Sequence, residues 1–170
     1  DELTAIYSAT FEMPYPFGPL LRILTLTGQR LNEVAGCQWA EINLEEAKWE
    51  LPRERSKNKT SHVVHLSNPA RKEFDNLMNP TKQELIFTTT GKTPVSGFSK
   101  AKKQLDKISG VNDWLLHDLR RTFATVATET LGYEPVVVDR VLNHINGSVK
   151  GIAAVYQKGQ YLEKRKIVLD

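Results

Sequence analysis

The fold of this chain is organised around residues 116–125, which read Leu116-His117-Asp118-Leu119-Arg120-Arg121-Thr122-Phe123-Ala124-Thr125. Apolar side chains at positions 119, 123, 126 and 127 recur at helical spacing and predict a packed helix. His117 and Arg120 lie three residues apart and therefore share a neighbouring face of that helix. An imidazole beside a guanidinium suits an anion that must be both held and protonated, which describes a phosphodiester better than a sugar or a peptide. The pattern alone also fits a solvated helix flank, because both residue types are mostly exposed.

The composition indicates one globular domain. With 170 residues and 40% hydrophobic content, the chain can bury somewhat under ~70% of its unfolded surface. The single cysteine, Cys37, cannot form an internal disulfide, and we expect it to be a buried thiol in a reducing cytosol. No apolar run approaches the ~20 residues of a membrane span, and the N-terminus lacks a signal-peptide pattern. Because the chain begins at Asp1 rather than Met, we expect it to be a fragment of a longer protein.

The charge of the chain is distributed unevenly. The net charge is only +3, but the first fifty residues carry three basic and eight acidic side chains, whereas residues 51–170 carry twenty and twelve. Basic residues gather in the segment 53–59 and again between residues 92 and 107. A surface of this kind can follow a polyanion backbone, although ordinary solvated lysine-rich faces give the same pattern.

The hydrophobic pattern predicts a mainly helical chain with three short strands. We expect helices over residues 2–12, 17–27, 69–78, 96–108 and 135–142, a short helix near 31–35 with Thr27 as its N-cap, and a central helix ended by Gly132. Strands are expected at 48–51, 62–66 and 85–87, with a basic loop over 52–61. His62 and His65 would point to opposite faces of their strand, so we expect no metal site there.

The residues able to handle a phosphate occur in a characteristic order. Thr27-Gly28-Gln29-Arg30 with Glu33 comes first, followed by a lysine in the 52–61 loop, His117-x-x-Arg120, His144 and a late Tyr156. This order resembles the catalytic domain of tyrosine recombinases of the phage-integrase family, particularly prophage and genomic-island integrases. The resemblance covers essentially residues 1–170. It implies an α+β fold, mainly α-helical with a small three-stranded antiparallel sheet at one edge, and N-terminal DNA-binding domains that lie outside this fragment.

The resemblance also implies a role for each residue of the site. Arg30 and Arg120 would clamp the scissile phosphate, His117 and His144 would donate hydrogen bonds or protons to it, Lys57 would be the general acid, and Tyr156 the nucleophile. Glu33 matches the acidic position that supports the first arginine. Lys59 remains an alternative to Lys57, and Tyr161 an alternative to Tyr156. We expect further DNA contacts from Arg53, Arg55, Lys59, Lys100, Lys103 and Arg121.

The chemistry of phosphodiester exchange requires these residue types. The transition state carries extra negative charge, and each preorganised guanidinium could stabilise it by roughly 3–4 kcal/mol, by analogy with oxyanion-hole deletions. Tyrosine is a weak nucleophile at its usual pKa of about 10, so the cationic pocket must help it lose its proton. A covalent 3′-phosphotyrosine keeps the energy of the broken bond. We therefore expect no ATP, no metal and no cofactor, and the sequence has neither a P-loop nor metal-ligand spacing.

The resemblance predicts a site-specific DNA recombinase or integrase of the bacterial cytosol that integrates or excises a mobile element. Its expected partners are double-stranded DNA attachment sites and further copies of itself in a tetramer held by the terminal helix, residues 160–170. Accessory DNA-bending proteins are a further class of partner that the resemblance suggests. Two alternatives stay open, a type IB topoisomerase and a non-catalytic DNA-binding module. The complete residue set argues against the second, because a binder needs charge but no tyrosine.

Overall fold

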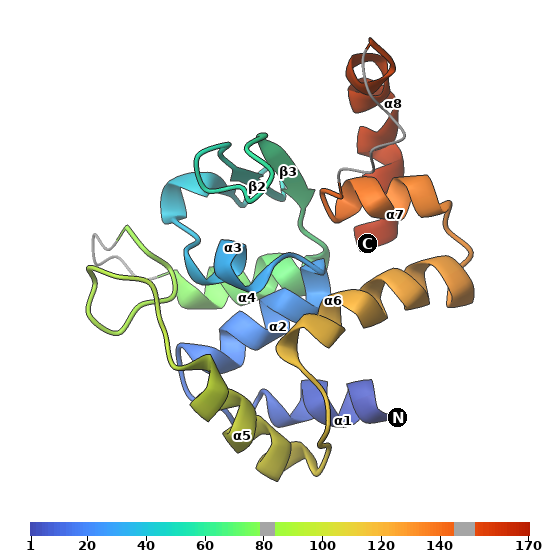
Figure 1. Cartoon of the computed structure of the whole chain (residues 1–170). Helices are drawn as coiled ribbons and strands as arrows, with labels where there is room; N and C mark the ends of the chain where they lie inside the picture. The colour runs from blue at the N-terminus through green and yellow to red at the C-terminus, as the bar shows by residue number, and fades with distance from the viewer. Residues whose placement is uncertain (79–83, 145–151) are drawn as a thin grey trace.

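The computed structural model of the chain describes residues 1–78, 84–144 and 152–170, with residues 152–160 described by their helical backbone alone. The helices are α1 (Glu2–Ala9), α2 (Phe17–Thr27), α3 (Leu31–Ala35), η1 (Trp39–Glu41), α4 (Asn68–Leu77), α5 (Phe98–Ser109), α6 (Leu116–Thr125), η2 (Val126–Thr130), α7 (Pro135–Val141) and α8 (Ile152–Leu169). The strands are β1 (Ile42–Asn43), β2 (Lys48–Leu51) and β3 (His62–His65). The small sheet lies at one edge of a mainly helical body (Figure 1), as predicted.

Helix α2 forms the centre of the core. Its side chains Leu20, Leu21, Ile23 and Leu24 are all at most 2% exposed, because the helix is apolar nearly all round and is covered on several sides. It contacts α3, α4 and α6, and it runs through the middle of the body in Figure 1. A left-handed Gly28, with φ of +63°, ends the helix. The interpretation of Thr27 as an N-cap is wrong, because Thr27 is the last residue of α2 and Arg30 precedes α3.

The sheet is antiparallel with the order β1-β2-β3. Trp49 on the central strand is fully buried and pairs with Ile42 on one side and Val64 on the other. The prediction of a third strand at 85–87 is wrong: Leu85 makes only an isolated bridge to Gln38, and the third strand is β1. Strand β1 has two residues, which is too short to show an alternating pattern in the sequence.

Helix α6 buries its predicted apolar face. Leu119 and Ala127 are buried, Phe123 is half-buried against the core, and Val126 is half-buried. Beyond Thr125 the helix continues as the π-helical turn η2. The prediction that Gly132 ends this segment is confirmed by its left-handed φ of +72°.

Helix α8 packs against its own domain at its C-terminal end. Val168 and Leu169 are buried there, whereas Leu162 and Ile167 are exposed. Arg165 donates a hydrogen bond to the carbonyl oxygen of Val63 on β3. We expected the terminal helix to begin after Tyr156, but α8 runs from residue 152 to 169 and includes that position.

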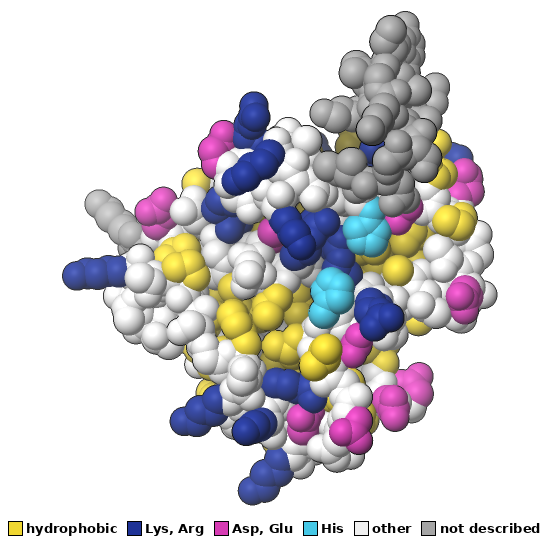
Figure 2. Space-filling model, viewed as in Figure 1, with side chains coloured by type: hydrophobic (Ala, Val, Ile, Leu, Met, Phe, Trp, Pro, Cys, Tyr) yellow, Lys and Arg dark blue, Asp and Glu magenta, His cyan; other side chains and the backbone are white. Residues whose placement is uncertain are grey.

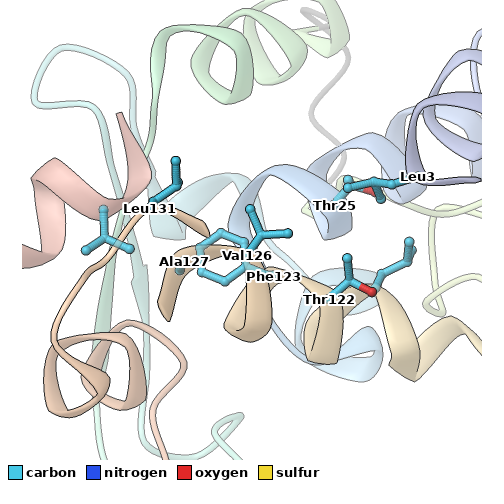
Figure 3. A pocket seen from close by; sticks show the side chains of 9 residues that line it. Leu3, Thr25, Thr122, Phe123, Val126, Ala127 and Leu131 are labelled. Atoms are coloured by element: carbon cyan, nitrogen blue, oxygen red, sulfur yellow. The ribbon is translucent and has the colours of Figure 1, made fainter. Parts of the chain in front are cut away.

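Two further features of the described residues bear on function. None of the described helices is both long and apolar enough to cross a membrane. A small pocket of about 110 Å³ lies between α1, α2, α6 and η2, where Leu3, Thr25, Thr122 and Phe123 line it (Figure 3). No ionisable side chain lines this pocket, so it offers nothing to hold a phosphate.

Candidate active site

An open pocket of about 510 Å³ brings together most of the predicted catalytic residues. Its lining consists of Leu24, Gln29, Arg30, Leu31, Asn32, Glu33, Arg55, Lys57, Leu116, His117 and Arg120. These residues come from α2 and the turn after it, from α3, from the β2–β3 loop and from the first turns of α6. Figure 2 shows basic and histidine side chains gathered in the middle of one face, with hydrophobic side chains beside them.

Arg30 is placed by the tight turn that follows α2. Gln29 is fully buried, and its amide nitrogen donates to the carbonyl oxygens of Thr27 and Val141 at 2.9 and 3.0 Å. The next residue, Arg30, caps α3 with its carbonyl oxygen, which accepts from the backbone N–H of Glu33 and Val34. The buried glutamine anchors the backbone on one side, so the arginine side chain is directed into the pocket.

Arg120 is held deep in the pocket floor. Only 4% of the residue is exposed, and its guanidinium donates to the carbonyl oxygens of Gly28, at 2.8 Å, and Leu142. Burial, and then the neighbouring charge of Arg30, lower the pKa of Arg120 to about 10. The group therefore stays cationic at neutral pH. Two guanidiniums held together repel each other, and an anion bound between them would lower that energy.

Glu33 links the first arginine to the lysine loop. This residue is 3% exposed, and its Oε1 lies 3.3 Å from Arg30 Nη1 and 3.1 Å from the backbone nitrogen of Lys57. The carboxylate thus accepts hydrogen bonds from both elements and offsets part of the positive charge. The role expected for Glu33 in supporting the first arginine stays a prediction.

The two candidate lysines differ in position. Lys57 is exposed and lines the pocket, whereas Lys59 is exposed but is not among the residues that line it. Lys59 also has a left-handed backbone, with φ of +55°, in a turn in which its N–H donates to the carbonyl oxygen of Ser56. The geometry favours Lys57 as the general acid, which stays a prediction.

The two histidines are placed by different elements. His117 lies exposed in the first turn of α6 and lines the pocket. His144 follows α7, and its Nδ1 lies 2.8 Å from Asp139 Oδ1. This contact orients the imidazole ring. His144 adjoins the site through Asn143, whose carbonyl oxygen accepts a hydrogen bond from Arg30 Nη2 at 3.2 Å.

The predicted nucleophile lies partly outside the described structure. Tyr156 falls within α8, but its side chain lies outside the described residues. The assignment of Tyr156 rather than Tyr161 therefore stays a prediction.

Five of the six residues expected to make further DNA contacts are exposed: Arg53, Lys59, Lys100, Lys103 and Arg121. Arg55 is different, because its side chain is 20% exposed and its Nη2 lies 2.6 Å from Glu41 Oε2. The same nitrogen also donates to the carbonyl oxygen of Glu33 at 3.2 Å. These contacts make Arg55 a brace between the β2–β3 loop and α3, and they leave its predicted DNA contact untested.

Sequence reasoning missed the polar residues that hold the site together. Asn58 donates to the carbonyl oxygen of Asn143, and Asn143 Nδ2 lies 3.2 Å from Ser56 Oγ. His62, which we considered only as a metal ligand, lies 3.0 Å from the carbonyl oxygen of Val141. No local signal could have found these contacts, because the partners lie 79 to 87 positions apart in the chain.

Comparison with known proteins identifies a matching family and a similar relative. The sequence profile described as "Phage integrase family" matches residues 1–157. Prophage integrase IntZ of Escherichia coli (strain K12) is 31% identical over 151 residues, covering 88% of this chain and 37% of the relative. The chain therefore spans little more than a third of that relative's length.

Solved structures share the fold at lower identity. The crystal structure of XerA recombinase matches with a TM-score of 0.70 and 18% identity, covering 95% of this chain and 62% of that chain. A lambda integrase tetramer bound to a Holliday junction matches with a TM-score of 0.66 and 19% identity, covering 92% and 46%. These likenesses confirm the predicted fold class.

Proposed function

This chain belongs to the phage integrase family, and from that premise we propose that it cleaves and rejoins DNA strands as the catalytic part of a site-specific recombinase. One observation carries the proposal: Arg30, Lys57, His117 and Arg120 converge on a single open pocket. Such a pocket offers two guanidiniums, an amine and an imidazole to one phosphate.

In the proposed reaction, the phenolic oxygen of Tyr156 attacks the scissile phosphorus and the bond from phosphorus to the 5′-oxygen breaks. Lys57 gives a proton to the departing oxygen, and an imidazole of the pocket, for which His117 is the candidate, takes up the phenolic hydrogen. Arg30 and Arg120 hold the non-bridging oxygens, where the negative charge increases. Rejoining runs the same steps backwards. Because the phosphotyrosine keeps the bond energy, the proposal requires neither ATP nor a metal.

The experiment that tests this proposal uses a nicked suicide duplex, which traps a covalent adduct because the cleaved end diffuses away. The chain is incubated at high concentration, in low salt and with a chelator, and any adduct is mapped by mass spectrometry. We expect an adduct on Tyr156 that disappears in Tyr156→Phe and persists in Tyr161→Phe. The reverse pattern would overturn the choice of nucleophile.

The remaining outcomes of the same experiment separate the alternatives. Relaxation of supercoiled plasmid without paired sites would favour a type IB topoisomerase. Absence of an adduct from both this chain and any longer protein that contains it, on the native site, would favour a non-catalytic DNA-binding module. An adduct formed only by such a longer protein would mean that DNA positioning depends on residues beyond these 170.

We propose a DNA-bound tetramer as the working assembly in the bacterial cytosol. The likeness to a lambda integrase tetramer supports it, as do the exposed Leu162 and Ile167 on α8. Because Val168 and Leu169 are buried against their own domain, passing the terminal helix to a neighbour would require that end to detach. Sedimentation of the protein with and without DNA tests the assembly, and accessory DNA-bending proteins would be sought in the same complexes.

A further inference from the structure

Three consecutive residues of the β2–β3 loop are each tied to another element. The backbone N–H of Lys57 donates to Glu33 Oε1 at 3.1 Å. On either side of it, Ser56 Oγ accepts from Asn143 Nδ2 at 3.2 Å, and Asn58 Nδ2 donates to the carbonyl oxygen of Asn143. The loop is therefore fixed on both flanks of the lysine, while the lysine side chain itself is exposed in the pocket.

Asn143 is the residue that meets both flanks. It lies two residues after the end of α7 and has a left-handed φ of +51°, a conformation in which glycine is the usual residue and asparagine one of the few others tolerated. Its carbonyl oxygen also accepts from Arg30 Nη2 at 3.2 Å. One residue thus contacts the lysine loop through its side chain and its backbone, contacts the first arginine, and immediately precedes His144.

From this geometry, and resting on the proposed function, we infer that Asn143 is a positioning residue that locks the Lys57 loop to the C-terminal end of α7. The physical reason is that a ten-residue loop samples many conformations, and a general acid is effective only within hydrogen-bond reach of the leaving oxygen. Ser56 is 1% exposed, so its hydroxyl is shielded from water and its bond to Asn143 has little competition. The side-chain lock would hold the general acid, whereas Arg30 contacts the Asn143 carbonyl oxygen, a contact that loss of the side chain leaves in place.

The first test needs no DNA. Amide hydrogen exchange of residues 55–59 is compared between the wild-type chain, Asn143→Gly and Ser56→Ala. Glycine adopts the left-handed backbone without strain, so Asn143→Gly removes the side-chain contact and little else. The matched control is Ala47→Gly, since Ala47 has the same φ of +51° and lies in the β1–β2 turn. We expect faster exchange at Lys57 in both loop variants and unchanged exchange there in the control.

The second test separates positioning of the general acid from a general loss of structure. Cleavage is measured on a duplex with an ordinary phosphodiester and on one whose 5′-bridging oxygen is sulfur, because a thiolate leaves without being protonated. We expect Asn143→Gly and Ser56→Ala to slow the ordinary reaction by about fivefold, the size of one hydrogen bond. The sulfur substrate should show no such loss, and Arg30→Ala should be slow on both substrates. The double variant should lose no more than either single one, because both remove the same bond.

Two results would overturn the inference: unchanged exchange at Lys57 in both loop variants, or equal losses on the oxygen and sulfur substrates. Failure of both the wild-type chain and a longer protein that contains it to cleave either substrate would overturn the proposed function instead. In that case the exchange measurement alone decides whether Asn143 anchors the loop.

Discussion

Replacing Arg120 with alanine should weaken the fold as well as the site. The guanidinium is almost fully buried, and it supplies hydrogen bonds to the carbonyl oxygens of Gly28 and Leu142, which belong to the ends of α2 and α7. These two ends are 114 positions apart in the sequence, and Arg120 joins them beside Gln29, whose amide nitrogen bridges Thr27 and Val141. In the proposed reaction the same group binds the phosphate, so a loss of activity alone would not reveal its structural contribution.

The size of the effect follows from the two carbonyl groups. A buried polar group left without its partner costs about 1–3 kcal/mol. Two such groups would cost ~2–6 kcal/mol, and removal of a buried, desolvated charge offsets part of this. We expect a net destabilisation of about 2–4 kcal/mol, a large fraction of the 5–15 kcal/mol typical of a domain.

Urea unfolding of the purified variants measures this difference. With a urea dependence of about 2 kcal/mol per molar, the midpoint of Arg120→Ala should fall by ~1–2 M. The adjacent residue supplies the control: the Arg121 side chain is 75% exposed and lies 3.2 Å from Asp118, so Arg121→Ala should stay within about 0.5 kcal/mol of wild type. Equal midpoints for Arg120→Ala and Arg121→Ala would refute the reasoning. They would mean that the two carbonyl groups find water or other donors at no cost.

Two further predictions concern residues beneath the site. Gly28→Ala should lower stability by about 1–3 kcal/mol, because a Cβ there would lie 2.8 Å from the ring of Phe123. At Gly97 a Cβ would have nothing within 4 Å, so Gly97→Ala should lower stability only by the smaller cost of a left-handed backbone. Thermal unfolding of the two variants measures the difference, and equal losses of stability would contradict the steric argument. Burial, and then the charge of Arg165, lower the pKa of His62 to about 3. In the unfolded chain this histidine binds a proton near pH 6.5, whereas in the folded chain it does so only near pH 3. The free energy of unfolding is therefore highest above pH 6.5 and decreases as the pH falls toward 3, by ~2 kcal/mol at pH 5. Urea unfolding at pH 7 and pH 5 should show a smaller loss in His62→Gln, and an identical loss would argue against the buried histidine as the cause.

The sequence predicted the elements whose pattern is local and strong. The apolar run of α2, the helical spacing of Leu119 and Phe123, and the glycine stop at Gly132 each depend on residues within a few turns of one another. The resemblance to the phage-integrase family also predicted which chemical groups belong to the site, and Arg30, Lys57, His117 and Arg120 do line one pocket. The errors fell where a local signal was too short or was shared between two elements. Strand β1 has only two residues, and Thr27 is the last residue of α2, four positions before α3 begins.

Only the tertiary structure decided how the polar groups of the site are paired. From the sequence we interpreted Arg55 as one of several cations in a basic loop that contact DNA. In the structure Arg55 pairs with Glu41 and donates to the carbonyl oxygen of Glu33, and the second contact ties the loop to α3. Arg120 is a buried link between two helix ends. Asn143 forms hydrogen bonds with Asn58 and Ser56, the residues on either side of Lys57, which lie 85 and 87 positions away in the sequence. The physical reason is that the type of a side chain and its place in a helical or strand pattern can be read from a short stretch of sequence. The partner of a buried donor or acceptor is instead fixed by which distant backbone the apolar core brings against it.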